Sequence, residues 1–308
     1  MAYNMKAIKK EFAGKGIFYT EPELAKYVRS FLPEDVKEIY DPTCGNGGLL
    51  SVFGNEVEKF GQEINAEQLA DAEKNLANFH GFCGDTLKNP AWMDRKFKYI
   101  IANPPFGIKW EPIVDVRFER IPCMPPKGCA DFAFLLHILY MLDKDGIAVC
   151  MDSCGILFRN NAEGELRRWF LENNLIEKVV YIPENQFVDT KIKTCLWVLN
   201  KAKKNTDIVF IDKKTKTEKT VSFDTIKANN FNLSQNFYFK ATKTLDLPPI
   251  GELLERMKND IVGQLKACFE LCRSLGSENL YGIFLEEIKQ ALNDAENKTV
   301  DRKEGYVE

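Results

Sequence analysis

Residues 36–48, VKEIYDPTCGNGG, decide the fold, because a short strand here ends in an acid and a glycine-rich turn. Residues 36–40 are predicted to form the strand, and the glycines after Asp41 let the chain turn tightly toward a helix start at residues 49–53. Open α/β sheets bind their ligands at such turns, at the carboxyl ends of strands. Many α/β proteins use a glycine turn only to change direction, so a function must rest on further stretches.

Strands and helices alternate along the next 150 residues. We expect strands at residues 57–64, 97–102, 146–151, 178–182 and 194–199, and helices at residues 66–79, 132–142 and 165–172. Helices of this length between strands imply right-handed crossovers. The sequence therefore predicts an α/β fold with a doubly wound, mainly parallel sheet. The lysine-rich stretch around residues 208–211 is expected to form a hairpin at the sheet edge, with contact to phosphate as the alternative.

The pattern becomes helical after Pro248 and Pro249. A heptad seam, interrupted at Gln264, is formed by Ile250, Leu254, Met257, Ile261, Cys268, Leu271 and Leu275. Such a seam packs either against the protein's own sheet or against another chain, and the spacing suits both. We expect a short lead over residues 1–15, a main domain over residues 16–245 and a helical extension over residues 246–308.

Composition limits the classes of protein that fit. The chain has 308 residues, of which 45% are hydrophobic and 28% are charged, as in ordinary globular proteins. It has no apolar run of about 18 residues and no signal segment, so we expect a cytoplasmic protein without a membrane span. Nine cysteines without a Cys-x-x-Cys pair and only two histidines argue against a zinc site. The net charge of −3 argues against unaided binding of nucleic acid over a wide surface.

Three acids stand where strands of the predicted sheet end. Asp41 disfavours a pyrophosphate beside it and suits a cationic or zwitterionic group. Glu63 lies 22 positions later, close to the spacing of about 20 at which an acid accepts from ribose hydroxyls in mononucleotide-binding folds. Ile64 is expected to lie against an adenine face and Asp85 to accept from the adenine amino group; taken alone, Asp85 better suits a turn or a helix cap, and its position after a strand favours the ligand role.

Residues 100–107, IIANPPFG, lead a strand directly into two prolines. Prolines donate no backbone hydrogen bond and fix their own φ, so the chain leaves the sheet in a stiff, extended form. The Asn103 side-chain oxygen and the Pro104 carbonyl would accept from an NH2 group and direct its lone pair toward an electrophile, while Phe106 stacks on a planar base. The pattern indicates transfer to an exocyclic or amide nitrogen, with a proline-rich loop of no function as the alternative.

The stretch GIFYTEPEL, residues 16–24, predicts a capped helix start. Thr20 is the expected N-cap, and Tyr19 is placed to pack against Leu24. Such a rigid helix end would also hold Tyr19 and Thr20 beside a nucleoside. His80 and His137 are expected to be structural.

These motifs follow the order found in one family. Over residues 14–240 the chain resembles the S-adenosylmethionine-dependent amino methyltransferases of DNA, specifically the modification subunits of type I restriction-modification systems. The stretches that carry the resemblance are GIFYT, IYDPTCGNGGLL, GQEIN, GDTL, IIANPPFG, ADFAFLLHIL, GILFRNNAEGELRRWFLENN and NNFNLSQNFYF.

The resemblance implies methylation of N6 of adenine in double-stranded DNA, with the target base flipped out of the helix and S-adenosyl-L-methionine as cofactor. It assigns the target adenine to Asn103, Pro104 and Phe106. It assigns the cofactor to Tyr19, Thr20, Asp41, Gly45, Gly47, Glu63 and Asp85. We expect Ile64 and Asn103 to complete the cofactor site.

The resemblance also implies partners, namely a specificity subunit that reads the DNA sequence and a second modification subunit. About 15 residues precede GIFYT, where the family usually has a helical domain, and Glu21 follows Thr20, where the family has proline. We therefore expect DNA binding to need a partner. Two alternatives stay open: transfer to another planar nitrogen (cytosine N4, an RNA base or a protein glutamine), and a scaffold that binds cofactor and partner without turnover.

Overall fold

The computed structural model describes residues 21–184, 193–239, 250–277, 281–283 and 285–290. The chain divides into two units, Met1–Lys240 and Ala241–Glu308. The expected lead over residues 1–15 and the boundary at residue 245 lie outside the described residues, so both stay predictions.

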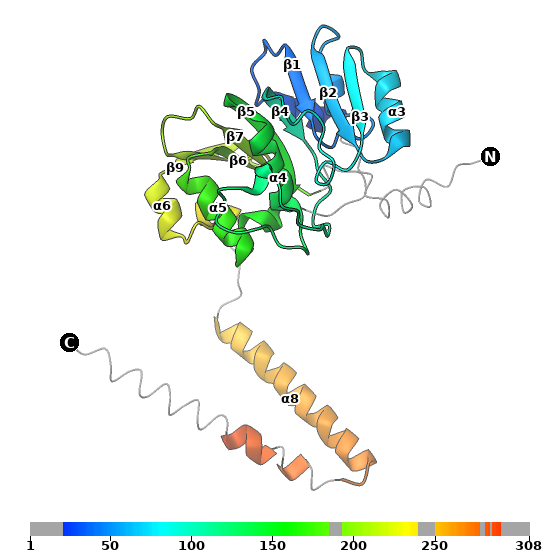
Figure 1. The fold of residues 1–308 in the computed structure, drawn as a ribbon. Coiled ribbons are helices and arrows are strands. Elements are labelled where there is room, and N and C mark those ends of the chain that lie inside the picture. Colours follow the sequence, from blue (N-terminus) through cyan, green and yellow to red (C-terminus); the bar gives the residue numbers. More distant parts are fainter. Residues whose placement is uncertain (1–20, 185–192, 240–249, 278–280, 284, 291–308) are drawn as a thin grey trace. The chain divides into compact units, whose positions relative to one another are not determined.

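The first unit is built on a nine-stranded sheet with the order β3-β2-β1-β4-β5-β7-β6-β8-β9 (Figure 1). Its strands are β1 (Glu38–Asp41), β2 (Glu58–Glu63), β3 (Phe79–Cys83), β4 (Phe97–Ala102), β5 (Leu142–Ser153), β6 (Ile176–Ile182), β7 (Thr194–Asn200), β8 (Ile208–Asp212) and β9 (Thr217–Val221). Its helices are α2 (Pro22–Arg29), α3 (Ala66–Asn75), α4 (Asp131–Met141), α5 (Ala162–Glu172), α6 (Phe223–Ala228) and α7 (Gln235–Tyr238), with single 3-10 turns at Leu50–Val52, Val116–Phe118 and Cys154–Leu157.

The sheet is parallel from β3 through β2, β1 and β4 to β5, and β6 pairs parallel with β8. β7 is inserted antiparallel between β5 and β6, and β8 and β9 form an antiparallel hairpin at one edge. The chain runs outward from β1 to β3 and then returns to the other side of β1 as β4. The expected α/β fold with a doubly wound, mainly parallel sheet is therefore confirmed, and so is the lysine-rich edge hairpin.

Apolar clusters cover both faces of the sheet. Successive residues of a strand point to opposite faces, and β4 shows this, since Ile100 joins the cluster that contains α4 and α5 whereas Ile101 joins the cluster that contains α2 and α3. α4 is apolar almost all round, as expected of a helix enclosed by the protein. Trp197 of β7 is fully buried, with ring centroids 6.1 Å from Phe132 and 6.2 Å from Phe170.

The sequence predicted the wrong length for two helices. The helix expected over residues 66–79 ends at Asn75, and Phe79 instead begins β3. Asn78 has a left-handed φ of 48° and its Nδ2 donates to the Asn55 carbonyl at 2.7 Å, which separates helix from strand. The helix start at residues 49–53 is only a 3-10 turn, because Phe53 is already extended. Apolar spacing alone fits both a helix and a strand over so few residues.

The second unit contains α8 (Ile250–Ser274), a helix of 25 residues. Its apolar stripe is largely solvent-accessible, with Leu254 60% exposed and Met257 and Ile261 also more than half exposed. Whether this stripe packs against the protein's own sheet or against another chain stays a prediction. No helix in the described part of the chain is both long enough and apolar enough to cross a membrane.

The first prediction concerns the strand that carries the Asn-Pro-Pro-Phe stretch. Ile101→Ala should lower the free energy of unfolding by about 2 to 5 kcal/mol, because it leaves a cavity at a fully buried position. Lys98→Ala on the same strand removes a half-exposed side chain 3.5 Å from Asp145 and should change that free energy by less than about 0.5 kcal/mol. Urea titrations of both variants measure the difference, and equal losses would contradict the packing of β4.

Candidate active site

A cavity of about 690 Å³ lies at the carboxyl ends of the strands on both sides of the point where the strand order reverses. This is the position at which doubly wound sheets bind ligands. Six of the residues expected from the sequence line it: Asp41, Gly45, Glu63, Ile64, Asp85 and Asn103. They come from β1, β2, the turn after β3 and the end of β4. The sequence therefore predicted six of the residues that line the cavity, although they come from four separate parts of the chain.

The glycine turn after β1 uses its glycines for two different purposes. Gly45 has φ of +54° and faces open space, since a Cβ there would meet nothing within 4 Å. Gly47 has φ of +86°, and a Cβ there would lie 2.6 Å from Cδ1 of Leu76. Gly45 borders the cavity, while Gly47 is required for close packing against the end of α3 and is not part of the lining.

Glu63 fixes this turn from the neighbouring strand. Its Oε2 accepts from the backbone N–H of Gly45 at 2.9 Å, and its Oε1 accepts from the backbone N–H of Asn65 at 2.9 Å. A carboxylate has about four lone-pair positions, so two bonds leave capacity for a ligand hydroxyl. Glu63 therefore has a structural role in addition to the ligand role that the spacing predicts.

Asp41 is buried beneath the turn, with only 1% of its surface exposed. Burial raises the pKa of its carboxyl from the usual 3.8 to about 8, the N–H of Thr43 that donates to Oδ1 at 2.9 Å opposes this rise, and the charge of Glu63 adds to it. Burial therefore favours the protonated form of Asp41 near neutral pH. A positive group in the cavity would favour the ionised form, which agrees with the cationic ligand expected from the sequence.

Asp85 has the structural role that its position left open, and its contact with an adenine amino group stays a prediction. Its Oδ1 accepts from the backbone N–H groups of Leu87 at 2.9 Å and Lys88 at 3.3 Å, as in a capped turn, and the residue also lines the cavity. Ile64 is 68% exposed, which leaves an apolar surface available at the cavity wall. The turn after β3 thus contributes the carboxylate of Asp85 to the cavity. Ile64, directly after β2, contributes an apolar side chain to the same lining.

The Asn-Pro-Pro-Phe stretch begins directly after the last residue of β4, as expected. Asn103 and Pro105 line the cavity, whereas Pro104 and Phe106 are not among the described lining residues. Phe106 packs against the apolar cluster that includes Leu24 and Leu49. Its stacking on a base stays a prediction, because the cavity that holds Asn103 does not include its ring. Tyr19 and Thr20 lie outside the described residues.

Sequence reasoning missed the group that holds the turn after β3. Arg117 is 3% exposed, and its guanidinium donates to the carbonyls of Thr86 at 2.8 Å and Leu87 at 2.6 Å. Asp115 balances the charge with two contacts of 2.9 Å. A single arginine in an irregular stretch carries no local signal, so only the fold reveals that it anchors a wall of the site.

His137 lies behind this arginine as a buried structural histidine. Its Nδ1 lies 3.0 Å from Nη1 of Arg117 and its Nε2 lies 3.2 Å from the hydroxyl of Tyr40. Because arginine only donates, Nδ1 accepts and the ring is neutral. Burial, reinforced by the charge of Arg117, lowers the pKa of His137 to about 3. The histidine therefore connects the anchor of the turn to β1 and does not titrate near neutral pH.

Comparison with known proteins gives a consistent result. A family model described as N-6 DNA methylase matches residues 3–221. The chain is 32% identical to the type I restriction enzyme MpnII methylase subunit of Mycoplasma pneumoniae, over 65% of this chain and 43% of that protein. It is 30% identical to the HindI methylase subunit of Haemophilus influenzae, over 64% and 49%. The chain thus spans less than half the length of these curated relatives.

A solved structure agrees with the sequence relatives. The type I restriction-modification methyltransferase subunit from Streptococcus thermophilus superposes with a TM-score of 0.67 at 30% identity. The match covers 72% of this chain and 59% of that one. The similarity therefore extends to the three-dimensional arrangement of the sheet and its helices.

The second prediction concerns the titration of Asp41. Its carboxyl carbon, observed by ¹³C NMR and assigned with Asp41→Asn, should titrate near pH 8 in the ligand-free protein. Because the folded state then binds more protons than the unfolded chain between about pH 4 and pH 8, the contribution of Asp41 to stability falls as the pH rises through this range. The Asp41→Asn variant should lack that slope, and a titration near pH 4 in the wild type would contradict the burial of Asp41.

Proposed function

Because the chain belongs to the family of N-6 DNA methylases, we propose that it transfers a methyl group from S-adenosylmethionine to N6 of an adenine in double-stranded DNA, as a modification subunit of a restriction-modification system. One observation carries the proposal: the acids at the ends of β1 and β2 and after β3 share a single cavity with Asn103 of the Asn-Pro-Pro-Phe stretch. A nucleoside-binding wall and a group that orients an amino nitrogen thus meet in one place.

The donor set of the cavity fits this cofactor. Asp41 suits the ammonium group of the zwitterionic amino-acid end, Glu63 retains acceptor capacity for ribose hydroxyls, and Asp85 suits an exocyclic amino group. Ile64 offers an exposed apolar surface for the adenine ring. The volume of about 690 Å³ is within the range of about 300 to 1,000 Å³ typical of small-molecule sites. When bound, S-adenosylmethionine supplies an electrophilic methyl group.

The protein's contribution to the reaction is orientation of the acceptor. The side-chain oxygen of Asn103 and the carbonyl of Pro104 accept hydrogen bonds from the two N–H groups of the adenine amino group. These bonds direct the nitrogen lone pair toward the cofactor side of the site, which turns a poor nucleophile into a correctly placed one. The base must leave the DNA stack to reach this position.

The charge of the chain and the apolar stripe of α8 support partners in DNA recognition. The net charge of −3 gives little general attraction to phosphates. Leu254, Met257 and Ile261 present an exposed apolar stripe that suits docking on a helix of another chain. We therefore assign sequence reading to a specificity subunit, with a second modification subunit completing the assembly.

The experiment that tests the function is transfer of radiolabelled methyl from S-adenosylmethionine to mixed genomic DNA, followed by nucleoside mass spectrometry. The protein is assayed alone and with a specificity chain encoded beside it. Label in N6-methyladenine, greater with the specificity chain, is the expected result. Label in cytosine N4, RNA or a protein glutamine would move the acceptor to another planar nitrogen. Absence of label despite cofactor binding would favour the scaffold.

The third prediction isolates the acceptor side. Asn103→Ala should lower the methyl-transfer rate by about 100-fold or more, because a preorganised hydrogen bond to the reacting group is lost. The dissociation constant for S-adenosylmethionine, measured by calorimetry, should stay within about tenfold. Asn173→Ala, which removes an exposed amide at the end of α5, is the matched control. Normal transfer by the Asn103→Ala variant would refute this mechanism.

The fourth prediction isolates the cofactor side. Glu63→Gln keeps the side-chain shape but provides only one acceptor oxygen, so it cannot serve Gly45, Asn65 and a ribose together. The dissociation constant for S-adenosylmethionine should rise by about 10-fold to 100-fold, which corresponds to about 1 to 3 kcal/mol. Glu58→Gln, at the other end of β2 and half exposed, should leave it unchanged. Equal affinities of the two variants would remove Glu63 from the ribose site.

A further inference from the structure

The loop that starts at Asn103 is fixed at its far end by a side chain from α4. Gly107, with φ of +65°, donates its backbone N–H to Oδ1 of Asp131 at 2.7 Å. The next residue, Ile108, accepts at its carbonyl from the N–H of Ala130 at 2.9 Å. Because Pro104 and Pro105 have no N–H, few backbone donors are left to anchor this loop. The bond from Gly107 to Asp131 is therefore a main constraint on its geometry.

Asp131 is itself held in place by a charged partner. It is the first residue of α4 and only 1% exposed. Its second oxygen, Oδ2, accepts from Nη2 of Arg159. The Nε of Arg159 also donates to both carboxylate oxygens of Glu163, at 3.0 Å and 2.9 Å. The guanidinium thus bridges two acids, and the oxygen of Asp131 that faces Gly107 has a fixed orientation.

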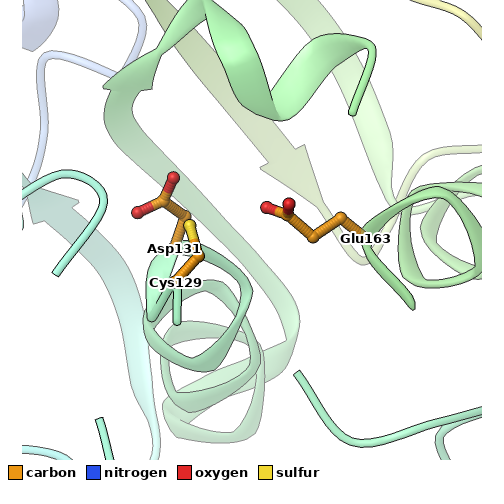
Figure 2. Close-up of side chains that lie close together, drawn as sticks. All are labelled: Cys129, Asp131 and Glu163. Carbon is orange, nitrogen blue, oxygen red and sulfur yellow. The ribbon is translucent and has the colours of Figure 1, made fainter. Parts of the chain in front are cut away.

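Cys129, Asp131 and Glu163 form a cluster with the composition of a metal site, but the guanidinium of Arg159 lies among them. Figure 2 shows Cys129 and Asp131 at the start of α4 facing Glu163 at the start of α5, and their ligand atoms lie within 4.8 Å of one another. Nη2 of Arg159 contacts the acids of both helices and lies 3.3 Å from Sγ of Cys129. The guanidinium therefore supplies the positive charge that a metal ion would otherwise provide.

Arg159 is anchored in turn by a second buried arginine. Arg167 is 2% exposed, and its Nη1 donates to the carbonyls of Arg159 at 2.8 Å and Ile156 at 3.1 Å. Its Nε donates to the carbonyl of Phe231 at 2.8 Å. The segment that presents Arg159 is therefore attached to α5 and to the chain near residue 231. A continuous set of hydrogen bonds leads from there to Gly107.

We propose that Asp131, oriented by Arg159, is a positioning residue that fixes the Asn103–Gly107 loop in the geometry required for methyl transfer. The inference rests on the proposed function and adds to it a residue that does not line the cavity. A displacement of about 1 Å at a reacting group is enough to cost about 100-fold in rate. A loop with two prolines and a glycine at its end needs such a constraint from outside its own backbone.

The test combines a rate with a measurement that needs no activity. Asp131→Ala should lower kcat for methyl transfer about 100-fold while the dissociation constant for S-adenosylmethionine changes less than about threefold. In the same variant, amide hydrogen exchange at Gly107, read from peptides that cover residues 103–110, should become at least about tenfold faster. Peptides over residues 79–88 should be unaffected. Asp131→Asn keeps an oxygen for Gly107 but loses the ion pair, so both effects should be smaller.

Asp212→Ala is the matched control. Asp212 is also a buried carboxylate that accepts backbone N–H groups in a turn, at the end of β8, and its loss should leave both the rate and the exchange at Gly107 unchanged. If Asp131→Ala fails to fold, the Asp131→Asn variant is measured instead. A wild-type rate of methyl transfer together with wild-type exchange at Gly107 in that variant would overturn the proposal. Faster exchange with a normal rate also overturns it.

The two proposals fail in different ways. If the wild type does not methylate DNA even with its specificity chain, the proposed function is lost, and Asp131 loses its role in transfer. The exchange measurement then still decides whether Asp131 fixes the loop. Unchanged exchange at Gly107 in Asp131→Ala, together with an active wild type and a slow variant, would mean that Asp131 affects transfer by another route and would overturn the positioning role.

Discussion

The structure depends on the parallel pairing of β1 with β2 on one side and β4 on the other. Tyr40 lies in register with Phe60 of β2 and with Ile100 of β4, so the three strands end together at one edge of the sheet. The chain leaves β1 toward one flank and β4 toward the other, because the order of the strands reverses between them. The cavity follows from this reversal, and Asp41, Glu63 and Asn103 owe their places in its lining to the ends of β1, β2 and β4.

Three of the turns at this edge are held by polar or charged side chains from elsewhere in the fold. Glu63 holds the glycine turn, Arg117 holds the turn after β3, and Asp131 holds the loop after β4. Charges with little exposed surface are costly unless they are paired and hydrogen-bonded, and Arg117 and Asp131 are both. Such groups favour one backbone geometry over near alternatives. For the proposed reaction, in which two reactants must be aligned, a single backbone geometry is an advantage.

The sequence predicted those parts of the site that depend on local patterns. Asp41 and Glu63 end β1 and β2 and Asn103 follows β4, and because the apolar runs and turn residues of these strands are recognisable, their common edge was expected. The boundary of α3 was missed because Leu76 and Phe79 fit helical spacing as well as a strand. Arg117, the antiparallel insertion of β7 and the position of Phe106 beside the α2 and α3 cluster depend on contacts between distant residues. No local pattern encodes these contacts.

The charged residues that line this cavity bear on the ligands that suit it. Asp41, Glu63 and Asp85 line one cavity together with Lys88 and Lys109, and carboxylates that share a space repel one another and any phosphate placed beside them. Asp41 is kept protonated near pH 7 by burial first and by Glu63 second, which reduces the repulsion while the cavity contains no cation. A ligand that carries positive charge next to Asp41 favours its ionisation and gains a buried ionic partner. We therefore expect these acids to favour a ligand with a positive charge beside Asp41, as the proposed cofactor has, and this expectation does not depend on the acceptor side of the site.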